Sequence, residues 1–267
     1  MTALFSWTNH VDRSGAALSA SQTAGDLTPS NMASPQVAIF WRTTSLTAWG
    51  QVDFGADVSI GCLALRFHRE GNSVPPETGT VQHQLDADGG TAGTGAVYDS
   101  TAISINCDPL YGYHLHVPTT AQTARYWRFT FASITDVSFL DVGRAWAGNA
   151  FQPTIDIGYP HEDAWGDRSL VTSTGRAGVE FVDDRCFQRI FGISMGAIDA
   201  TDRESVRSML RATGLSSQLL FCLDPSTADG RKRDTIIGRR SQNRSLNRAI
   251  PSGPALYSTS LSIRESL

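Results

Sequence analysis

The strongest constraint on the fold is the alternation of side chains along residues 125–131, RYWRFTF. Trp127, Phe129 and Phe131 fall on one side of an extended chain, and more polar residues alternate with them on the other. A period of two with aromatic content predicts a β-strand with one buried face. A second extended segment follows at residues 137–148. We expect the two segments to form the last hairpin of a β-sandwich.

Short strand patterns separated by turn residues continue on both sides of this pair. About eight strands are expected before residue 148, the first at residues 36–42, QVAIFWR. Residues 149–169 are rich in turn formers and contain two prolines, which is typical of a linker or a long arm. The sequence therefore predicts a mainly β protein with two β-sandwich domains, residues 1–150 and 151–267.

The second half adds one helix to further strand patterns. Residues 201–213 are predicted to be helical, because Thr201 and Glu204 have the spacing of a capping box. The apolar stripe of this helix consists of Val206, Met209 and Leu210. The flanking strands are expected in the segments AGVEFV, CFQRIFGISM, QLLFCL, TIIG and LYSTSLSIRE.

Composition excludes several classes of protein. Of the 267 residues, 40% are hydrophobic and 18% are charged, which is typical of a soluble globular chain. The net charge of −4 gives no general attraction to nucleic acid or to an anionic membrane. No stretch has the length of a spanning helix, and the first residues lack a secretory signal, so we expect synthesis in the cytoplasm and no membrane partner. The four cysteines are widely spaced, and we expect buried thiols.

Three short patterns invite a chemical interpretation. GISMG, residues 192–196, matches the nucleophile elbow, but no histidine follows Ser194 in the chain, so a catalytic serine is not expected. His114 and His116 could share a metal with His83, or they could be polar residues on an outer face. DADGG, residues 86–90, could begin a calcium loop but more closely matches a turn. The sequence predicts no enzyme, no cofactor and no metal site.

The sharpest charge signal is a basic segment at residues 231–248. Its seven basic residues are opposed only by Asp234, so the segment carries +6 while the rest of the chain carries −10. The candidate interface residues are Arg231, Lys232, Arg233, Arg239, Arg240, Arg244 and Arg248. The segment is interpreted either as a solvated hairpin or as a surface that contacts an acidic partner, including another copy of the chain. Nucleic-acid contact is disfavoured because the segment lacks stacking aromatics.

Four aromatic residues near expected strand ends are candidates for contact with a sugar. They are Trp41, Trp49, Tyr111 and Tyr113. An aromatic face at the surface can stack on a sugar ring, but aromatic residues at strand ends also serve the core or its rim.

The layout of these segments resembles proteins of phage tails. The first half, with SNMASPQVAIFWRTT, GQVDFGADVSIGCLALRFHREG and RYWRFTF closing at FLDVGRAWAG, resembles the galactose-binding, discoidin-like jelly rolls of tailed-phage tail proteins. The second half, with its helix, SQLLFCLDP, basic segment and final YSTSLSIRESL, is similar to domains of siphophage tail-tip proteins, with a tail-tube-like β-sandwich.

The resemblance implies a structural virion protein of the tail tip, a distal tail protein or baseplate adaptor assembled in the host cytoplasm. It further implies a homo-oligomeric ring, favoured to be a hexamer, that joins the tail tube to the baseplate or fibre. Tube, hub and fibre proteins would then be its partners. The alternative function is a carbohydrate-binding module that recognises host surface glycans.

Overall fold

Strands dominate the computed structural model, which describes residues 2–87, 96–173, 180–185, 187–242, 245–248 and 256–267. The expectation of a mainly β protein is confirmed. The chain forms two compact units, Met1–Pro153 with Leu219–Ile237 and Thr154–Gln218 with Gly238–Leu267. Each unit therefore combines two separate stretches of sequence. The division into folding domains at residue 150 stays a prediction.

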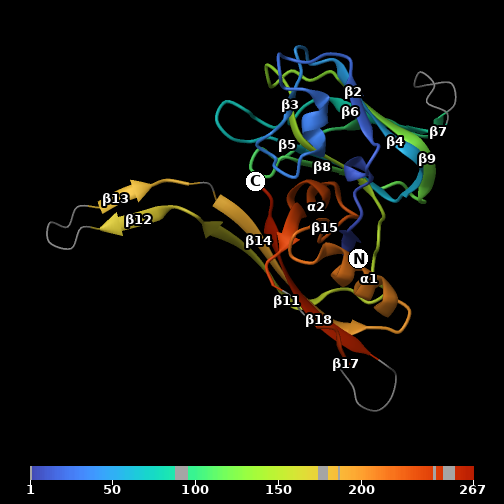
Figure 1. Ribbon diagram of the computed structural model, residues 1–267, viewed down its shortest axis with the longest axis vertical. Coiled ribbons are helices and arrows are strands. Elements are labelled where there is room, and N and C mark those ends of the chain that lie inside the picture. The colour runs from blue at the N-terminus through green and yellow to red at the C-terminus, as the bar shows by residue number, and fades with distance from the viewer. Residues whose placement is uncertain (1, 88–95, 174–179, 186, 243–244, 249–255) are drawn as a thin grey trace. The chain divides into compact units, whose positions relative to one another are not determined.

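The first unit contains two antiparallel sheets that enclose one hydrophobic core (Figure 1). The five-stranded sheet has the order β2 (Ala17–Ala20), β4 (Ala48–Ile60), β9 (Gln122–Ala132), β6 (Thr80–Asp86) and β7 (Ala96–Ser104). The four-stranded sheet has the order β3 (Trp41–Arg42), β10 (Asp141–Gly148), β5 (Cys62–Phe67) and β8 (Tyr113–His116). Two short 3-10 helices, η1 (His10–Asp12) and η2 (Pro29–Ala33), pack against β10.

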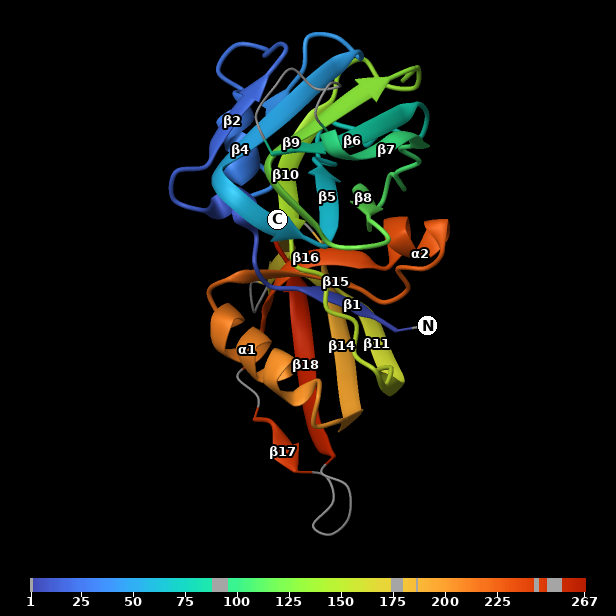
Figure 2. The same cartoon turned by 90° about the vertical axis from the view of Figure 1, so that its right-hand side faces the viewer.

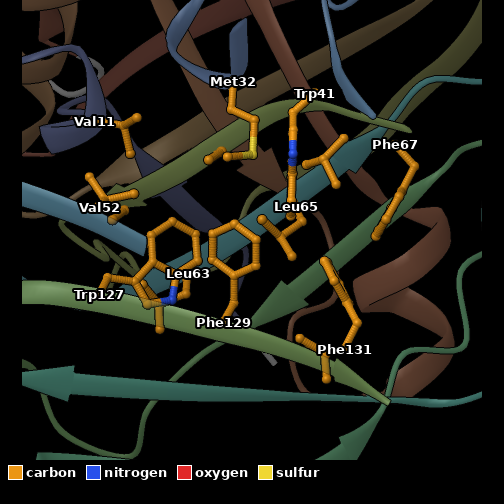
Figure 3. Close-up of a cluster of buried hydrophobic side chains, with 14 of the residues drawn as sticks. Val11, Met32, Trp41, Val52, Leu63, Leu65, Phe67, Trp127, Phe129 and Phe131 are labelled. Carbon is orange, nitrogen blue, oxygen red and sulfur yellow. The ribbon is translucent and has the colours of Figure 1, made fainter. Parts of the chain in front are cut away.

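The aromatic side of β9 lies in this core, as the alternation predicts. Trp127, Phe129 and Phe131 are fully buried (Figure 3). Phe129 contacts Trp41 of the opposite sheet with ring centroids 6.2 Å apart, and Phe131 contacts Phe67 at 6.0 Å. Burying each such side chain stabilises the sandwich by about 1.5–3 kcal/mol.

The expected closing hairpin is wrong. β9 pairs with β4 and β6, whereas β10 pairs with β3 and β5 in the other sheet. Residues 133–140 connect them across the sandwich, and eight residues are ample for the roughly 10 Å between stacked sheets. β9 and β10 both contribute side chains to the same core, and they enclose it from opposite sides because they lie in different sheets.

The strand expected at residues 36–42 is also largely wrong. Only Trp41–Arg42 is extended, and the preceding residues form a turn in which the N–H of Ile39 donates to the carbonyl of Gln36. Trp41 is buried, but Ile39 is exposed and has no neighbouring strand in the described chain. Apolar content alone therefore overstated the length of this strand.

A returning segment of the chain covers the outer face of the four-stranded sheet. It contains β15 (Gln218–Cys222), α2 (Ala228–Arg233) and the first part of β16 (Thr235–Arg240), and β15 also pairs with β1 (Leu4–Ser6). A second core of buried residues joins these elements. It consists of Leu4, Cys62, Ala64, Tyr113, Leu115, Trp146, Leu220, Cys222 and Ile237. This cover explains why every residue of β5 and β10 is buried.

The second unit contains a sheet in which the last part of β16 is followed by β18 (Tyr257–Glu265), β14 (Phe187–Ile198) and β11 (Gly158–Asp167). β17 (Asn247–Arg248) pairs with β18. The linker expected at residues 149–169 is therefore wrong for its second half, which forms β11. β11 is the edge strand of this order, and its outer edge pairs with no other strand in the described chain.

A two-stranded ribbon extends from the ends of β11 and β14 (Figure 1). It is made of β12 (Leu170–Ser173) and β13 (Glu180–Asp183), which pair only with each other in the described chain. We call these two strands the arm.

The predicted helix is present as α1 (Arg203–Thr213), but its predicted cap is wrong. Asp202 is the N-cap and makes no side-chain capping bond. Its carboxylate instead accepts from the N–H of Thr154 at 2.6 Å, so this contact competes with local capping. α1 lies beside β18, where the Arg203 guanidinium stacks over the ring of Tyr257 (Figure 2).

The buried face of α1 generates a test of the second unit. Val206 has no exposed surface, whereas Ser208 of the same helix is exposed. Val206→Asp should lower the free energy of unfolding by several kcal/mol, because it buries a carboxylate without a partner. Ser208→Asp should change it by less than about 1 kcal/mol. Urea denaturation of both variants measures the difference, and equal midpoints would show that α1 is not packed on its sheet.

Candidate functional site

The three histidines considered as metal ligands meet in the first unit. His83 comes from β6 of one sheet, and His114 and His116 come from β8 of the other. The ring of His83 stacks on both, with centroids 5.2 Å and 5.3 Å apart. The alternation along β6 could have revealed this position, since His83 has the same phase as the buried Val81 and Leu85.

Hydrogen bonds fix the protonation state of two of these rings. The indole N–H of Trp127 can only donate, so Nδ1 of His83 accepts from it at 3.3 Å. Nε2 of His83 must then carry the proton and donate to Nε2 of His114, 3.1 Å away. Nδ1 of His114 in turn donates to the carbonyl of Ile105 at 3.2 Å. His83 and His114 are both neutral in this chain of bonds.

This arrangement is unsuited to a metal. All four ring nitrogens of His83 and His114 are engaged, and within the described ranges no group of three or more His, Cys, Asp or Glu side chains is arranged to hold a metal ion. The other interpretation, polar residues on an outer face, is wrong for His114, which is buried. β8 is covered on one face by the returning segment and on the other by the five-stranded sheet, so the alternation of its residues does not distinguish core from surface.

The electrostatics of the cluster favour neutral imidazoles. Burial lowers the pKa of His83 well below its usual value, and the neighbouring imidazoles of His114 and His116 lower it further. Burial also lowers the pKa of His114 and of His116 to about 4, and the positive charge of Arg231 adds to both shifts. Tyr98 of β7 completes the cluster, with its hydroxyl 2.6 Å from Nε2 of His116.

A cavity of about 290 Å³ opens beside the histidines, between β8, the chain that follows β7, and α2. Its walls include the apolar Ile105, Tyr113 and Leu115 and the polar Asn106. His114 and His116 lie on one side and Arg231 and Lys232 of α2 on the other.

The basic segment does not form a solvated hairpin, which was one of its two interpretations. Arg231, Lys232 and Arg233 lie on α2 in the first unit. Arg233 pairs with Asp108 at 2.9 Å, and Lys232 pairs with Asp229 at 2.9 Å. Three of the seven basic residues are thus part of the returning segment.

The remaining basic residues belong to the second unit and serve different purposes. Arg240 is buried and donates to the carbonyls of Leu210 and Gly214 at the end of α1, which places a positive charge at a helix C-terminus. Arg239 donates to the carbonyl of Ser216 at 2.8 Å. Arg248 is exposed on β17, and Arg244 lies outside the described residues. A role of these basic residues in subunit contact stays a prediction, but the guanidinium of Arg240 is already hydrogen-bonded to the end of α1.

The four aromatic residues proposed to contact a glycan differ in their burial. Trp41 and Tyr113 are fully buried, so neither can offer a ring face at the surface. Trp49 and Tyr111 are half-buried, and the guanidinium of Arg128 covers the ring of Trp49 at 4.1 Å. The four residues therefore do not form one exposed aromatic platform.

The structure also places most residues of three other sequence patterns: GISMG, the cysteines and DADGG. Ser194 lies inside β14, opposite Ser260, and not at a turn between a strand and a helix. Cys62, Cys107 and Cys222 are buried free thiols, as expected, whereas Cys186 lies outside the described residues. Asp86 ends β6, but residues 88–90 of the calcium-like pattern are not described.

The sequence predicted a strand over part of the arm, in the segment AGVEFV, but not that its apolar side chains are exposed. Half of the twelve large hydrophobic side chains that are exposed in the described chain fall within residues 165–187. They are Trp165, Leu170, Val171, Phe181, Val182 and Phe187. Exposed apolar side chains so concentrated are typical of an interaction surface.

No helix in the described part of the chain is both long and apolar enough to span a lipid bilayer.

Comparisons with known proteins give likenesses in fold only. No family model matches the chain, and no curated protein matches it. Among solved structures, chitosan-binding module 1 of a chitosanase/glucanase from Paenibacillus sp. IK-5 is 16% identical, with a TM-score of 0.42 over 54% of this chain and 99% of that one. The family 32 carbohydrate-binding module of C. perfringens NanJ, in complex with galactose, is 11% identical, with a TM-score of 0.42 over 54% and 98%.

The lectin domain of lectinolysin, complexed with Lewis B antigen, is 20% identical, with a TM-score of 0.43 over 53% of this chain and 96% of that one. The similar structures are galactose-binding-like jelly rolls, the fold expected for the first half. Likeness at this level carries no inference about function.

The neutral histidines make the stability of the first unit depend on pH. The pKa of His114 and His116 is about 4 in the folded protein, below the ordinary value of 6.5. Between these values the unfolded chain binds more protons, so the free energy of unfolding should fall as the pH falls from about 6.5 to 4. Each of the two histidines contributes up to about 1.4 kcal/mol per pH unit, so the slope between pH 6 and 5 should be about 2–3 kcal/mol per pH unit.

Urea denaturation at pH 7.5, 6.0 and 5.0 measures this slope, and His114→Gln should reduce it. Between pH 7.5 and 8.5 histidines are neutral in both states and should contribute nothing. A free energy of unfolding that stays constant from pH 6.5 to 5.0 would contradict the buried neutral cluster.

Proposed function

We propose that the protein is a non-enzymatic structural protein that assembles with copies of itself, with the arm of each copy covered by its neighbour. The observation that carries the proposal is the exposure of apolar side chains on both faces of the arm. Every described residue of β12 and β13 is exposed, and Phe181 and Val182 are each 62% exposed.

The pairing of the arm explains why it needs a partner. Val171 lies opposite Val182 on one face, and Leu170 and Phe181 lie on the other. An isolated two-stranded ribbon is marginally stable in water, and here neither face is covered by the described chain. Its outer edges also present unpaired N–H and C=O groups that another strand can use.

A second copy of the chain is the partner that best fits this surface. Each copy brings the same ribbon with the same unpaired edges, and charged side chains flank the apolar ones, including Asp183 and Arg185. Contacts of one arm with the next copy can close into a ring. The sequence resemblance supplies the more specific proposal, a hexameric ring at a phage tail tip in contact with tube, hub and fibre proteins.

Carbohydrate binding by the first unit is the second candidate function. Some of the similar solved structures are named for the glycans they hold, galactose and Lewis B antigen. For this chain the support is its own cavity, which combines accessible apolar side chains, Ile103 and Ala228, with the polar groups of Asn106 and His116. This reading does not depend on the four aromatic residues proposed from sequence.

Mass measurement of the purified protein tests the assembly. We expect a multimer of the 28.8 kDa chain, and Phe181→Ser with Val182→Ser should weaken association more than tenfold, because two central apolar side chains at a contact contribute about 2 kcal/mol or more. Light scattering after gel filtration measures the mass. The far-ultraviolet circular dichroism spectrum should not change, since both side chains are exposed in the single chain and neither supports its fold.

The matched control is Val74→Ser with Leu110→Ser, two exposed apolar residues of the first unit. This pair should leave the multimer intact. A wild-type monomer at all concentrations, or a multimer that survives the arm substitutions unchanged, would contradict self-assembly through the arm.

A further inference from the structure

The cavity in the first unit has an unbalanced charge. Arg231 and Lys232 line it, and no acidic residue is among its described lining residues. Lys232 pairs with Asp229, but the guanidinium of Arg231 has only one hydrogen bond in the described chain, from Nε to the carbonyl of Thr227 at 3.3 Å. A half-buried arginine that faces a cavity without a carboxylate is matched by an anionic ligand.

The position of these cations is fixed by contacts within the same unit. Arg233 holds α2 to the chain after β7 through its ion pair with Asp108. The hydroxyl of Tyr113 accepts from the N–H of Ile237, which fastens the segment that follows α2. A Cβ at Gly230 would lie 2.1 Å from the carbonyl oxygen of Asp224, so the turn before the helix is tightly packed. The cationic wall is therefore preorganised.

The opposite walls suit a ring with both polar and apolar faces. Ile103 of β7 and Ala228 of α2 supply the accessible apolar surface, because Ile105 and Leu115 line the cavity but are buried. Asn106 and His116 supply hydrogen-bonding groups. Asn106 has a positive φ of 34°, a conformation that asparagine adopts more readily than most residues and that is frequent at ligand sites. A volume of about 290 Å³ is at the small end for ligand pockets, which matches a single small molecule better than an oligosaccharide.

We propose that this cavity binds an acidic monosaccharide, such as a uronic acid, with its carboxylate on Arg231 and Lys232 and its ring against Ile103 and Ala228. The proposal rests on carbohydrate binding as the second candidate function and specifies the class of sugar. It does not depend on assembly through the arm.

Titration of the full-length protein with D-glucuronate, D-glucose and inorganic phosphate tests the site. Isothermal calorimetry gives the affinities, and shifts of backbone amide resonances locate the contact. Glucuronate should bind at least about tenfold more tightly than glucose or phosphate, because the site engages both the carboxylate and the ring. Resonances of Asn106, His116 and Arg231 should shift.

Arg231→Gln should weaken glucuronate binding about 10- to 100-fold, since it removes a charge-assisted contact while it keeps a polar side chain. Arg248→Gln removes the same charge from β17, which does not line the cavity, and should change the affinity less than about twofold. The thermal midpoints of both variants verify folding.

The failures are distinguishable. Glucose that binds as tightly as glucuronate, with no effect of Arg231→Gln, would overturn the acidic-sugar site while leaving carbohydrate binding in place. Phosphate that binds as tightly as glucuronate would overturn sugar recognition at this site. No binding of either sugar would overturn both the site and the second candidate function.

Discussion

The architecture of the first unit depends on the return of residues 219–237 to the sandwich. This segment covers the outer face of β5, β8 and β10, so the four-stranded sheet is buried on both sides. Two polar contacts specify where it lies: the N–H of Ile237 donates to the hydroxyl of the buried Tyr113, and Arg233 pairs with Asp108. Without this cover, Leu115 and Trp146 would face water and the cavity would lack its cationic wall.

The histidine cluster lies between the two sheets of the first unit, and the cover adds one positive charge to its surroundings. Burial between two sheets keeps His83 and His114 neutral, and their hydrogen bonds run in one direction from Trp127 to Ile105. Arg231 contributes a nearby positive charge that further disfavours imidazolium. A bound carboxylate would offset that charge, so the cavity and the cluster are electrostatically coupled. The arm lies in the other unit and raises a separate question, how a ribbon with two apolar faces is kept from water.

Local sequence patterns were accurate where one face of an element is buried. The alternation of Trp127, Phe129 and Phe131 gave both the strand and its buried side, and the stripe with Val206 and Met209 gave α1. Local sequence patterns were less accurate where a residue binds a group far away in the sequence instead of a neighbouring one. Asp202 receives the N–H of Thr154 instead of completing a cap, and Arg240 serves α1 instead of a basic hairpin.

The sequence by itself determined the mainly β composition, the strands with one buried face, the helix and the burial of the three described cysteines, because period and side-chain chemistry are local properties. Only the tertiary structure decided which strands pair, that β9 and β10 lie in different sheets, and that His83 meets His114 and His116. It also decided that Arg231 faces a cavity while Arg240 is buried against α1. These outcomes depend on contacts between residues far apart in the chain, and the free energy of such contacts leaves no periodic signal in the sequence.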